Sequence, residues 1–134
     1  MTLIKSINPY NGELLAEYNS PSEEELEKKL SSGSVAFSMW KETDFAKRGQ
    51  LMSKAANVLK KNREKYANII SLEMGKVIKE SLAEVDKCAW VCEYYAQNSV
   101  DFLEPEAIDL PDGKKAKVLH QPLGIILAVM PWND

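Results

Sequence analysis

The feature of this sequence that most constrains its fold is an uninterrupted apolar segment near its carboxyl end. Residues 125–130 read Ile-Ile-Leu-Ala-Val-Met and follow the turn formers Pro122 and Gly124. An apolar run rich in β-branched side chains is typical of a strand covered on both faces of a parallel sheet. Such a strand needs neighbours on both edges, yet only residues 131–134 follow it. We therefore expect the strand to belong to a sheet whose remaining strands this chain does not contain.

The residues before this segment carry the periodicity and the end signals of helices. Ser22 and Glu25 form a capping box, Asp44 is a second N-cap, and Gly75 suits the left-handed end of a helix. Turn formers at residues 8–13 predict a small hairpin or a pair of short strands ahead of the helices. We predict four helices in succession, over residues 22–40, 44–61, 62–74 and 77–103.

The spacing of apolar residues predicts which faces of two helices are buried. Free cysteines are among the most buried residue types, so we also expect Cys88 and Cys92 to lie in the core. The expected stripes comprise Leu51, Ala55, Val58 and Leu59 in the second helix, and Leu82, Val85, Ala89, Cys92, Ala96 and Val100 in the last.

An arm is predicted between the last helix and the apolar segment. Residues 106–113 are polar and rich in turn formers. Residues 115–120 alternate Ala116, Val118 and His120 with Lys115, Lys117 and Leu119, which predicts a half-exposed strand.

Composition excludes several classes of protein. The chain of 134 residues has 17 Lys and Arg against 20 Asp and Glu, so its net charge is −3 and nucleic acid is not expected as a partner. Its longest apolar run, residues 123–132, falls short of the roughly 20 residues that a membrane-spanning helix needs. Its 2 cysteines offer no disulfide framework, so we expect a cytoplasmic protein.

Most residue patterns that carry chemistry are incomplete in this sequence. The Gly-Lys pairs at residues 75–76 and 113–114 lack the earlier glycine that a phosphate-binding loop requires. Cys88 and Cys92 are far along the chain from the single histidine, His120, so they do not suggest a zinc site.

The tripeptide Pro131-Trp132-Asn133 directly follows the apolar segment. In open α/β sheets, ligands bind at the carboxyl ends of the strands, which is where this tripeptide would lie. The side-chain amide of Asn133 offers uncharged N–H donors of the kind that stabilise a developing oxyanion. Trp132 offers a flat apolar wall for a ring. A turn that merely closes the strand explains the same residues, and the tripeptide alone favours that interpretation.

Seven short motifs occur in order along the chain: Asn8-Pro9 with Gly12-Glu13; Trp40 with Arg48 and Leu51; Glu73-Met74-Gly75-Lys76; Glu80 with Glu84-Val85; Tyr94-Tyr95-Ala96; Pro122-Leu123-Gly124; and Pro131-Trp132-Asn133. Each is common alone. Together they resemble the N-terminal part of the aldehyde dehydrogenases, which oxidise aldehydes with NAD or NADP through a cysteine thioester. Residues 84–90 and 94–96 are most similar to the succinate-semialdehyde dehydrogenases of this superfamily.

This resemblance implies an α/β fold class and an incomplete domain. The expected architecture is the helix-rich N-terminal part of an aldehyde dehydrogenase: a short N-terminal β element, four helices, an extended arm and the first strand of the cofactor-binding parallel sheet. The implied divisions are a helical part of the cofactor-binding domain over residues 1–104, the start of an oligomerisation arm over 105–123, and the first sheet strand over 124–134, with the catalytic domain absent.

The resemblance also implies roles for individual residues. Asn133 matches the asparagine whose amide holds the oxyanion, and Asp86 matches a position that contributes to a monovalent-cation site in some members. The segment implied to contact NAD or NADP comprises Val129, Met130, Pro131, Trp132 and Asn133. Asp134 departs from the family pattern, which usually has an apolar or aromatic residue there.

The function implied is oxidation of a small-molecule aldehyde, succinate semialdehyde, in an intact protein that forms a homo-oligomer. The family's nucleophilic cysteine lies downstream of the residue matched by Asn133, so the chain alone is expected to be inactive. A different class of function remains open, which is a stand-alone helical module that uses its arm to bind other chains.

Overall fold

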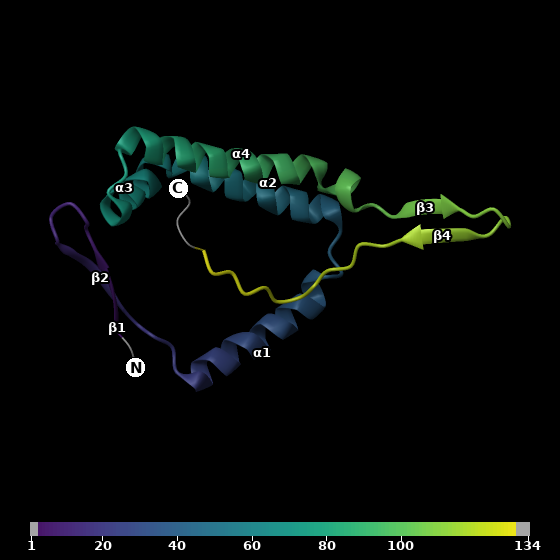
Figure 1. Cartoon of the computed structure of the whole chain (residues 1–134), viewed down its shortest axis with the longest axis horizontal. Helices are drawn as coiled ribbons and strands as arrows, with labels where there is room; N and C mark the ends of the chain where they lie inside the picture. The colour runs from purple at the N-terminus through teal and green to yellow at the C-terminus, as the bar shows by residue number, and fades with distance from the viewer. Residues whose placement is uncertain (1–2, 131–134) are drawn as a thin grey trace. The chain divides into compact units, whose positions relative to one another are not determined.

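The computed structural model describes residues 3–130, which form two compact units. The three-helix unit combines Met1–Ser20 with Asp44–Phe102. The α1 unit combines Pro21–Thr43 with Leu103–Asp134 and is named for its helix, α1 (Glu23–Trp40). Each unit is therefore assembled from two separate stretches of sequence, whose elements are labelled in Figure 1.

A β-hairpin opens the three-helix unit, as predicted. Its strands, β1 (Leu3–Ile7) and β2 (Leu14–Asn19), pair antiparallel. The buried side chain of Asn8 accepts a hydrogen bond from the N–H of Tyr10 at 2.9 Å. The backbone carbonyl of Asn8 accepts another from Gly12, whose φ of +75° favours glycine. The turn formers seen in the sequence therefore close this hairpin.

Three helices follow, namely α2 (Phe45–Lys61), α3 (Arg63–Met74) and α4 (Ile78–Leu103). The carboxylate of Asp44 accepts a hydrogen bond from the N–H of Lys47 at 2.6 Å, which confirms the predicted N-cap of α2. Gly75 ends α3 with a φ of +69°, in the left-handed conformation that its position predicted.

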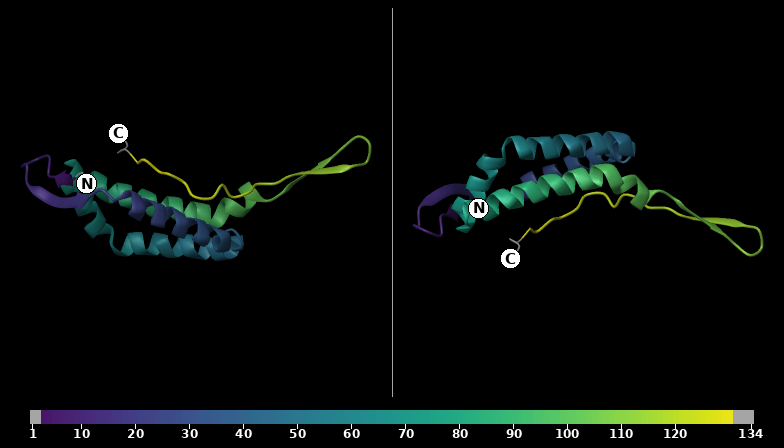
Figure 2. Two further views of the ribbon diagram at one scale, coloured as in Figure 1. Left: turned by 90° about the horizontal axis from the view of Figure 1, so that it is seen from below. Right: turned by 90° about the horizontal axis from the view of Figure 1, so that it is seen from above.

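Helices α2 and α4 run alongside each other and touch at small residues (Figures 1 and 2). A Cβ atom placed on Gly49 of α2 would lie 2.8 Å from the backbone oxygen of Ala96 in α4. Ala56 of α2, Ala67 of α3 and Ala89 of α4 are fully buried. The core of this unit is therefore built from residues that let helix backbones approach closely.

This packing corrects part of the predicted core. Val85 is buried as expected, but Leu51 and Val58 expose 37% and 51% of their surface. The buried alanine of α2 is Ala56, and Ala55 is exposed. At about 100° per residue, Leu51 and Val58 lie roughly half a turn around α2 from Gly49, so they are on the face opposite the contact with α4. Apolar periodicity therefore predicted the helices correctly but misplaced some of their contacts.

The predicted burial of both cysteines is also wrong. Cys88 is exposed and Cys92 is half-buried. The buried residues of α4 are Ser81, Val85 and Ala89, which recur at four-residue intervals along one face. Each residue of an α-helix is rotated by about 100° from its neighbour, so Cys88 lies off the face that Ala89 occupies.

The α1 unit contains a capped helix and a second hairpin. The Ser22 hydroxyl accepts a hydrogen bond from the N–H of Glu25 at 3.2 Å, and the Glu25 carboxylate accepts one from the N–H of Ser22 at 2.8 Å. This is the predicted capping box. None of the four helices described within residues 3–130 is long and apolar enough to cross a membrane.

The second hairpin pairs β3 (Glu106–Asp109) antiparallel with β4 (Lys115–Val118), and Figure 2 shows it as a two-stranded ribbon. The strand predicted at 115–120 is confirmed over its first part. β3 was missed because its sequence, Glu-Ala-Ile-Asp, is short and every one of its residues is exposed. Gly113 forms the turn with a φ of +74°.

The strand expected over residues 124–134 is not formed within the described chain. Residues 119–130 have no regular secondary structure, and Figure 1 shows them as an irregular trace. Leu127, Val129 and Met130 expose 89%, 79% and 84% of their surface, so the described chain does not cover this segment. A strand requires hydrogen bonds to a neighbour, and the strands described here pair only as β1 with β2 and β3 with β4.

Candidate functional site

The apolar segment that leads to the predicted site rests on α1 at its beginning. Ile125 lies beside Gly33, where an added Cβ atom would be 3.0 Å from the Ile125 Cδ1 atom. Gly124 lies beside the ring of Phe37, at 3.8 Å from the position of an added Cβ to Cε1. Gly124 has a φ of +104°, which side chains other than glycine rarely adopt. The sequence analysis singled out this apolar segment, but it did not predict the contact between Ile125 and Gly33.

The structure describes only two of the five residues that are predicted to bind the cofactor, Val129 and Met130. Val129 and Met130 are exposed, so their apolar side chains are open to a ligand. Pro131, Trp132 and Asn133 lie outside the described residues. The predicted roles of all five residues therefore stay predictions.

Asp86, the predicted cation ligand, is held by an arginine. Its two carboxylate oxygens accept hydrogen bonds from Arg63 Nε and Nη2, at 2.6 Å and 2.7 Å. These bonds lower the pKa of Asp86 below its usual range and raise the pKa of Arg63. The fork joins the first residue of α3 to the third turn of α4. Within residues 3–130, no group of three or more His, Cys, Asp and Glu side chains is placed to hold a metal ion.

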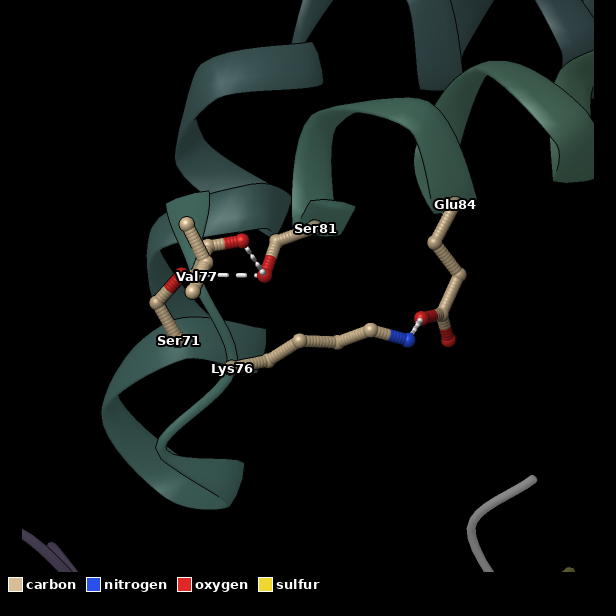
Figure 3. Close-up of polar contacts among 5 residues, drawn as sticks. All are labelled: Ser71, Lys76, Val77, Ser81 and Glu84. Atoms are coloured by element: carbon tan, nitrogen blue, oxygen red, sulfur yellow. Dashed lines mark hydrogen bonds and ion pairs between the residues drawn. The ribbon is translucent and has the colours of Figure 1, made fainter. Parts of the chain in front are cut away.

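A second set of polar contacts fastens the turn between α3 and α4, as Figure 3 shows. The hydroxyl oxygens of Ser71 and Ser81 are 2.9 Å apart, and Ser81 is fully buried. Lys76 in the turn pairs with Glu84, and the hydrogen bond to that carboxylate raises the pKa of Lys76. Lys76 and Glu84 both belong to the sequence motifs. Their ion pair connects the α3–α4 turn to α4, which gives both residues a structural role.

Exposed aromatic side chains mark the remaining motif on α4. The ring of Tyr94 lies 5.7 Å from Trp90, 5.3 Å from Tyr95 and 6.1 Å from Phe102, centroid to centroid. Each of the four exposes between 38% and 58% of its surface. The Tyr94-Tyr95 pair is therefore part of an aromatic row on the surface of this helix.

A sequence profile of the aldehyde dehydrogenase family matches residues 1–134. The chain belongs to the aldehyde dehydrogenase family. Its four helices and short strands match the N-terminal part of that fold, as the resemblance implied. The fold is also similar to that of the protein Gox0499, which aligns with 92% of this chain and 27% of its own length at a TM-score of 0.87 and 26% identity.

Relatives in this aldehyde dehydrogenase family carry a more specific name. A probable NADP(+) succinate-semialdehyde dehydrogenase of Synechocystis is 40% identical over 97% of this chain and 28% of its own length. The NADP(+) succinate-semialdehyde dehydrogenase of Deinococcus radiodurans is 34% identical over 96% of this chain and 27% of its own length.

A solved succinic semialdehyde dehydrogenase from Streptococcus pyogenes, in complex with NADP+, aligns with 86% of the chain and 25% of its own length at a TM-score of 0.80 and 30% identity. The chain thus spans little more than a quarter of the relatives it matches.

Proposed function

We propose that the full-length protein containing this chain oxidises succinate semialdehyde to the carboxylic acid, with NADP+ as hydride acceptor. The observation that carries the proposal is similarity along nearly the whole chain to relatives of that name, at 34% to 40% identity. The names of these relatives specify NADP+, so we propose it ahead of NAD+, which the sequence alone left open.

Residues of this chain contribute to two parts of the proposed site. The amide of Asn133 donates hydrogen bonds to the oxyanion that forms when a nucleophile attacks the aldehyde carbon. Val129 and Met130 leave most of their apolar surface uncovered, which fits packing against the nicotinamide-ribose part of a dinucleotide, together with Pro131 and Trp132. The cofactor supplies the acceptor for the hydride.

The nucleophile is proposed to lie elsewhere in the full-length protein. The family's nucleophilic cysteine lies downstream of the residue that Asn133 matches, whereas Cys88 and Cys92 both precede it, on α4. We therefore propose that the 134-residue chain by itself does not oxidise aldehydes. Reduction of NADP+ by the purified chain, above a blank without aldehyde, would contradict this.

An oligomer built through the arm is a further part of the proposal. The arm, residues 105–123, includes the β3–β4 hairpin, in which every residue except Ala116 is exposed. This exposure also favours the alternative in which the chain is a stand-alone interaction module. Light scattering measures the mass of the protein with and without residues 105–123 and so tests whether the arm forms the oligomer. Enzyme assays distinguish an aldehyde dehydrogenase from a stand-alone interaction module. The proposed compartment is the cytoplasm.

A cation role for Asp86 is proposed on the family resemblance alone. Each carboxylate oxygen already accepts a hydrogen bond from Arg63, so a cation would share Asp86 with this guanidinium. The check is the potassium and sodium dependence of activity in the full-length protein. Asp86→Asn should weaken that dependence, and an unchanged dependence would remove Asp86 from the site.

The direct test of the function is a steady-state assay of the full-length protein. Formation of the reduced cofactor is measured with NADP+ or NAD+ and with aldehydes that carry or lack a terminal carboxylate. The proposal predicts the highest kcat/KM for succinate semialdehyde with NADP+. A uniform preference for uncharged aldehydes would contradict the substrate, a preference for NAD+ would contradict the cofactor, and absence of turnover with every pair would contradict aldehyde oxidation.

A further inference from the structure

The aromatic row of α4, which consists of Trp90, Tyr94, Tyr95 and Phe102, forms one continuous surface. The Tyr94 ring lies between 5.3 Å and 6.1 Å from each of the other three rings, centroid to centroid. Trp90 exposes 58% of its surface and Phe102 exposes 50%. Soluble proteins rarely leave a large contiguous apolar patch uncovered unless it binds something. The row is therefore a candidate interface.

The row lies on the side of α4 that faces away from α2. Helix α4 meets α2 at Ala96, whose backbone oxygen lies against Gly49. At about 100° per residue, Tyr94 lies about 160° around the helix from Ala96. Trp90 and Phe102 each lie about 120° from Ala96, on either side of it. The contact that builds the three-helix unit therefore leaves the row uncovered.

The core of the described chain contains only small side chains. Within residues 3–130 the buried apolar residues are Ala56, Ala67, Val85 and Ala89, so none is larger than valine. Aromatic side chains bury about 150–250 Å² each and usually dominate cores and interfaces. The three-helix unit thus keeps its largest side chains outside its own core. This arrangement is expected where a further layer of protein packs on the outer face of α4.

The length of the relatives indicates what that layer is. The chain spans 28% of the Synechocystis relative and 27% of Gox0499, so nearly three-quarters of each lies outside the matched part. The match is to the N-terminal part of the fold, so in these relatives the remainder follows it. We propose that the aromatic row binds the part of the full-length protein that follows residue 134.

The chemistry of the row specifies what that part presents to it. The rings take apolar or aromatic side chains as neighbours. The hydroxyls of Tyr94 and Tyr95 and the indole N–H of Trp90 are polar groups that need hydrogen-bond partners once water is excluded. The covering surface therefore combines an apolar centre with hydrogen-bond acceptors near its edge.

Hydroxyl-radical footprinting of the full-length protein measures whether the row is covered. The radicals oxidise tryptophan and tyrosine side chains that solvent reaches, and mass spectrometry gives the rate at each residue. Trp90, Tyr94 and Tyr95 should react several-fold more slowly in the folded protein than in the same protein digested to peptides. A rate for Trp90 that matches its 58% exposure in the described chain would overturn the proposal.

Photo-crosslinking of the full-length protein identifies what covers the row. p-Benzoylphenylalanine replaces Trp90, keeps a large aromatic side chain there and captures nearby C–H bonds on irradiation. A product with the mass of one chain, joined to a peptide that follows residue 134, supports the proposal. A product with the mass of two chains would make the row an interface between copies and overturn it, and capture of peptides from residues 1–134 alone would also overturn it.

A charge on the row gives an independent thermal measurement. Trp90→Glu places a carboxylate against the covering surface, so the thermal midpoint of the full-length protein should fall by several degrees. Trp90→Phe keeps an apolar ring and should lower the midpoint less. Lys54→Glu, on an exposed position of α2, is the control and should leave it near that of the wild type. Equal midpoints for the two Trp90 variants would contradict a covered row. None of these measurements requires turnover, so the proposed function can fail without deciding this inference.

Discussion

Gly49 limits how closely α2 and α4 approach each other. A methyl group at this position would lie 2.8 Å from the backbone oxygen of Ala96, which cannot move without shifting α4. We expect Gly49→Ala to destabilise the protein by about 1–3 kcal/mol, the usual range for overpacking, although alanine is the better helix former. Thermal unfolding measures this, with Lys54→Ala on an exposed position of α2 as the control. Stabilisation by Gly49→Ala would contradict the close contact.

The capping box of α1 makes the stability of the folded protein depend on pH in the acid range. The backbone N–H and the hydroxyl of Ser22 lower the pKa of Glu25 below its ordinary value. A lowered pKa in the folded state means that the stabilisation is present above the ordinary glutamate pKa and is lost as the pH falls through the lowered value. Ser22→Ala should reduce stability by about 1 kcal/mol near neutral pH and return the pKa of Glu25 toward its ordinary value. Carboxyl NMR titration checks this, and an unchanged Glu25 pKa would refute the contribution of the Ser22 hydroxyl, since Ser22→Ala keeps the backbone N–H.

At the scale of elements, the fork between Arg63 and Asp86 joins α3 to α4. Because Arg63 lowers the pKa of Asp86, the pair stabilises the fold above the ordinary aspartate pKa, and that stabilisation disappears as the pH falls through the lowered value. Arg63→Met should raise the pKa of Asp86 and flatten the acid side of the stability profile. Arg63→Lys keeps the charge but loses the planar fork, so its Asp86 pKa should lie between those of wild type and Arg63→Met.

The elements that the sequence predicted well are those whose signals are local. Ser22, Asp44 and Gly75 each mark a helix end through a contact within four residues, and all three are confirmed. The fork from Arg63 to Asp86 spans 23 positions and carries no such local signal. Glycine inside a helical pattern, at Gly33 and Gly49, is the signal that could have located close contacts, because a helix loses stability there.

The site was less predictable than the helices for a related reason. Val129 and Met130 have the composition of a strand that is covered on both faces, yet such a strand also depends on partners that lie elsewhere in a chain, and both residues are exposed. The residue types therefore indicated the kind of environment these side chains suit. They did not determine whether that environment is present.

At the scale of the whole molecule, the exposed apolar segment indicates a surface that the full-length protein covers. Leu127, Val129 and Met130 expose 89%, 79% and 84% of their surface. We infer that the rest of the full-length protein covers residues 125–130, and we expect their amide hydrogens to exchange slowly there and rapidly in the 134-residue chain. Hydrogen exchange followed by mass spectrometry compares the two, with residues 115–118 of β4 as a paired reference. Rapid exchange of 125–130 in both would contradict the covered strand.

The central claim is that this chain supplies the amide that stabilises the oxyanion, and the most direct measurement is the single-turnover rate of NADPH formation in the full-length protein. Asn133→Ala removes that amide and should lower the rate roughly 100-fold or more. The aldehyde concentration that gives half of the maximal rate should stay largely unchanged. Asn57→Ala, on an exposed position of α2, should leave the rate unchanged. A rate for Asn133→Ala equal to that of the wild type would contradict the assigned role of Asn133.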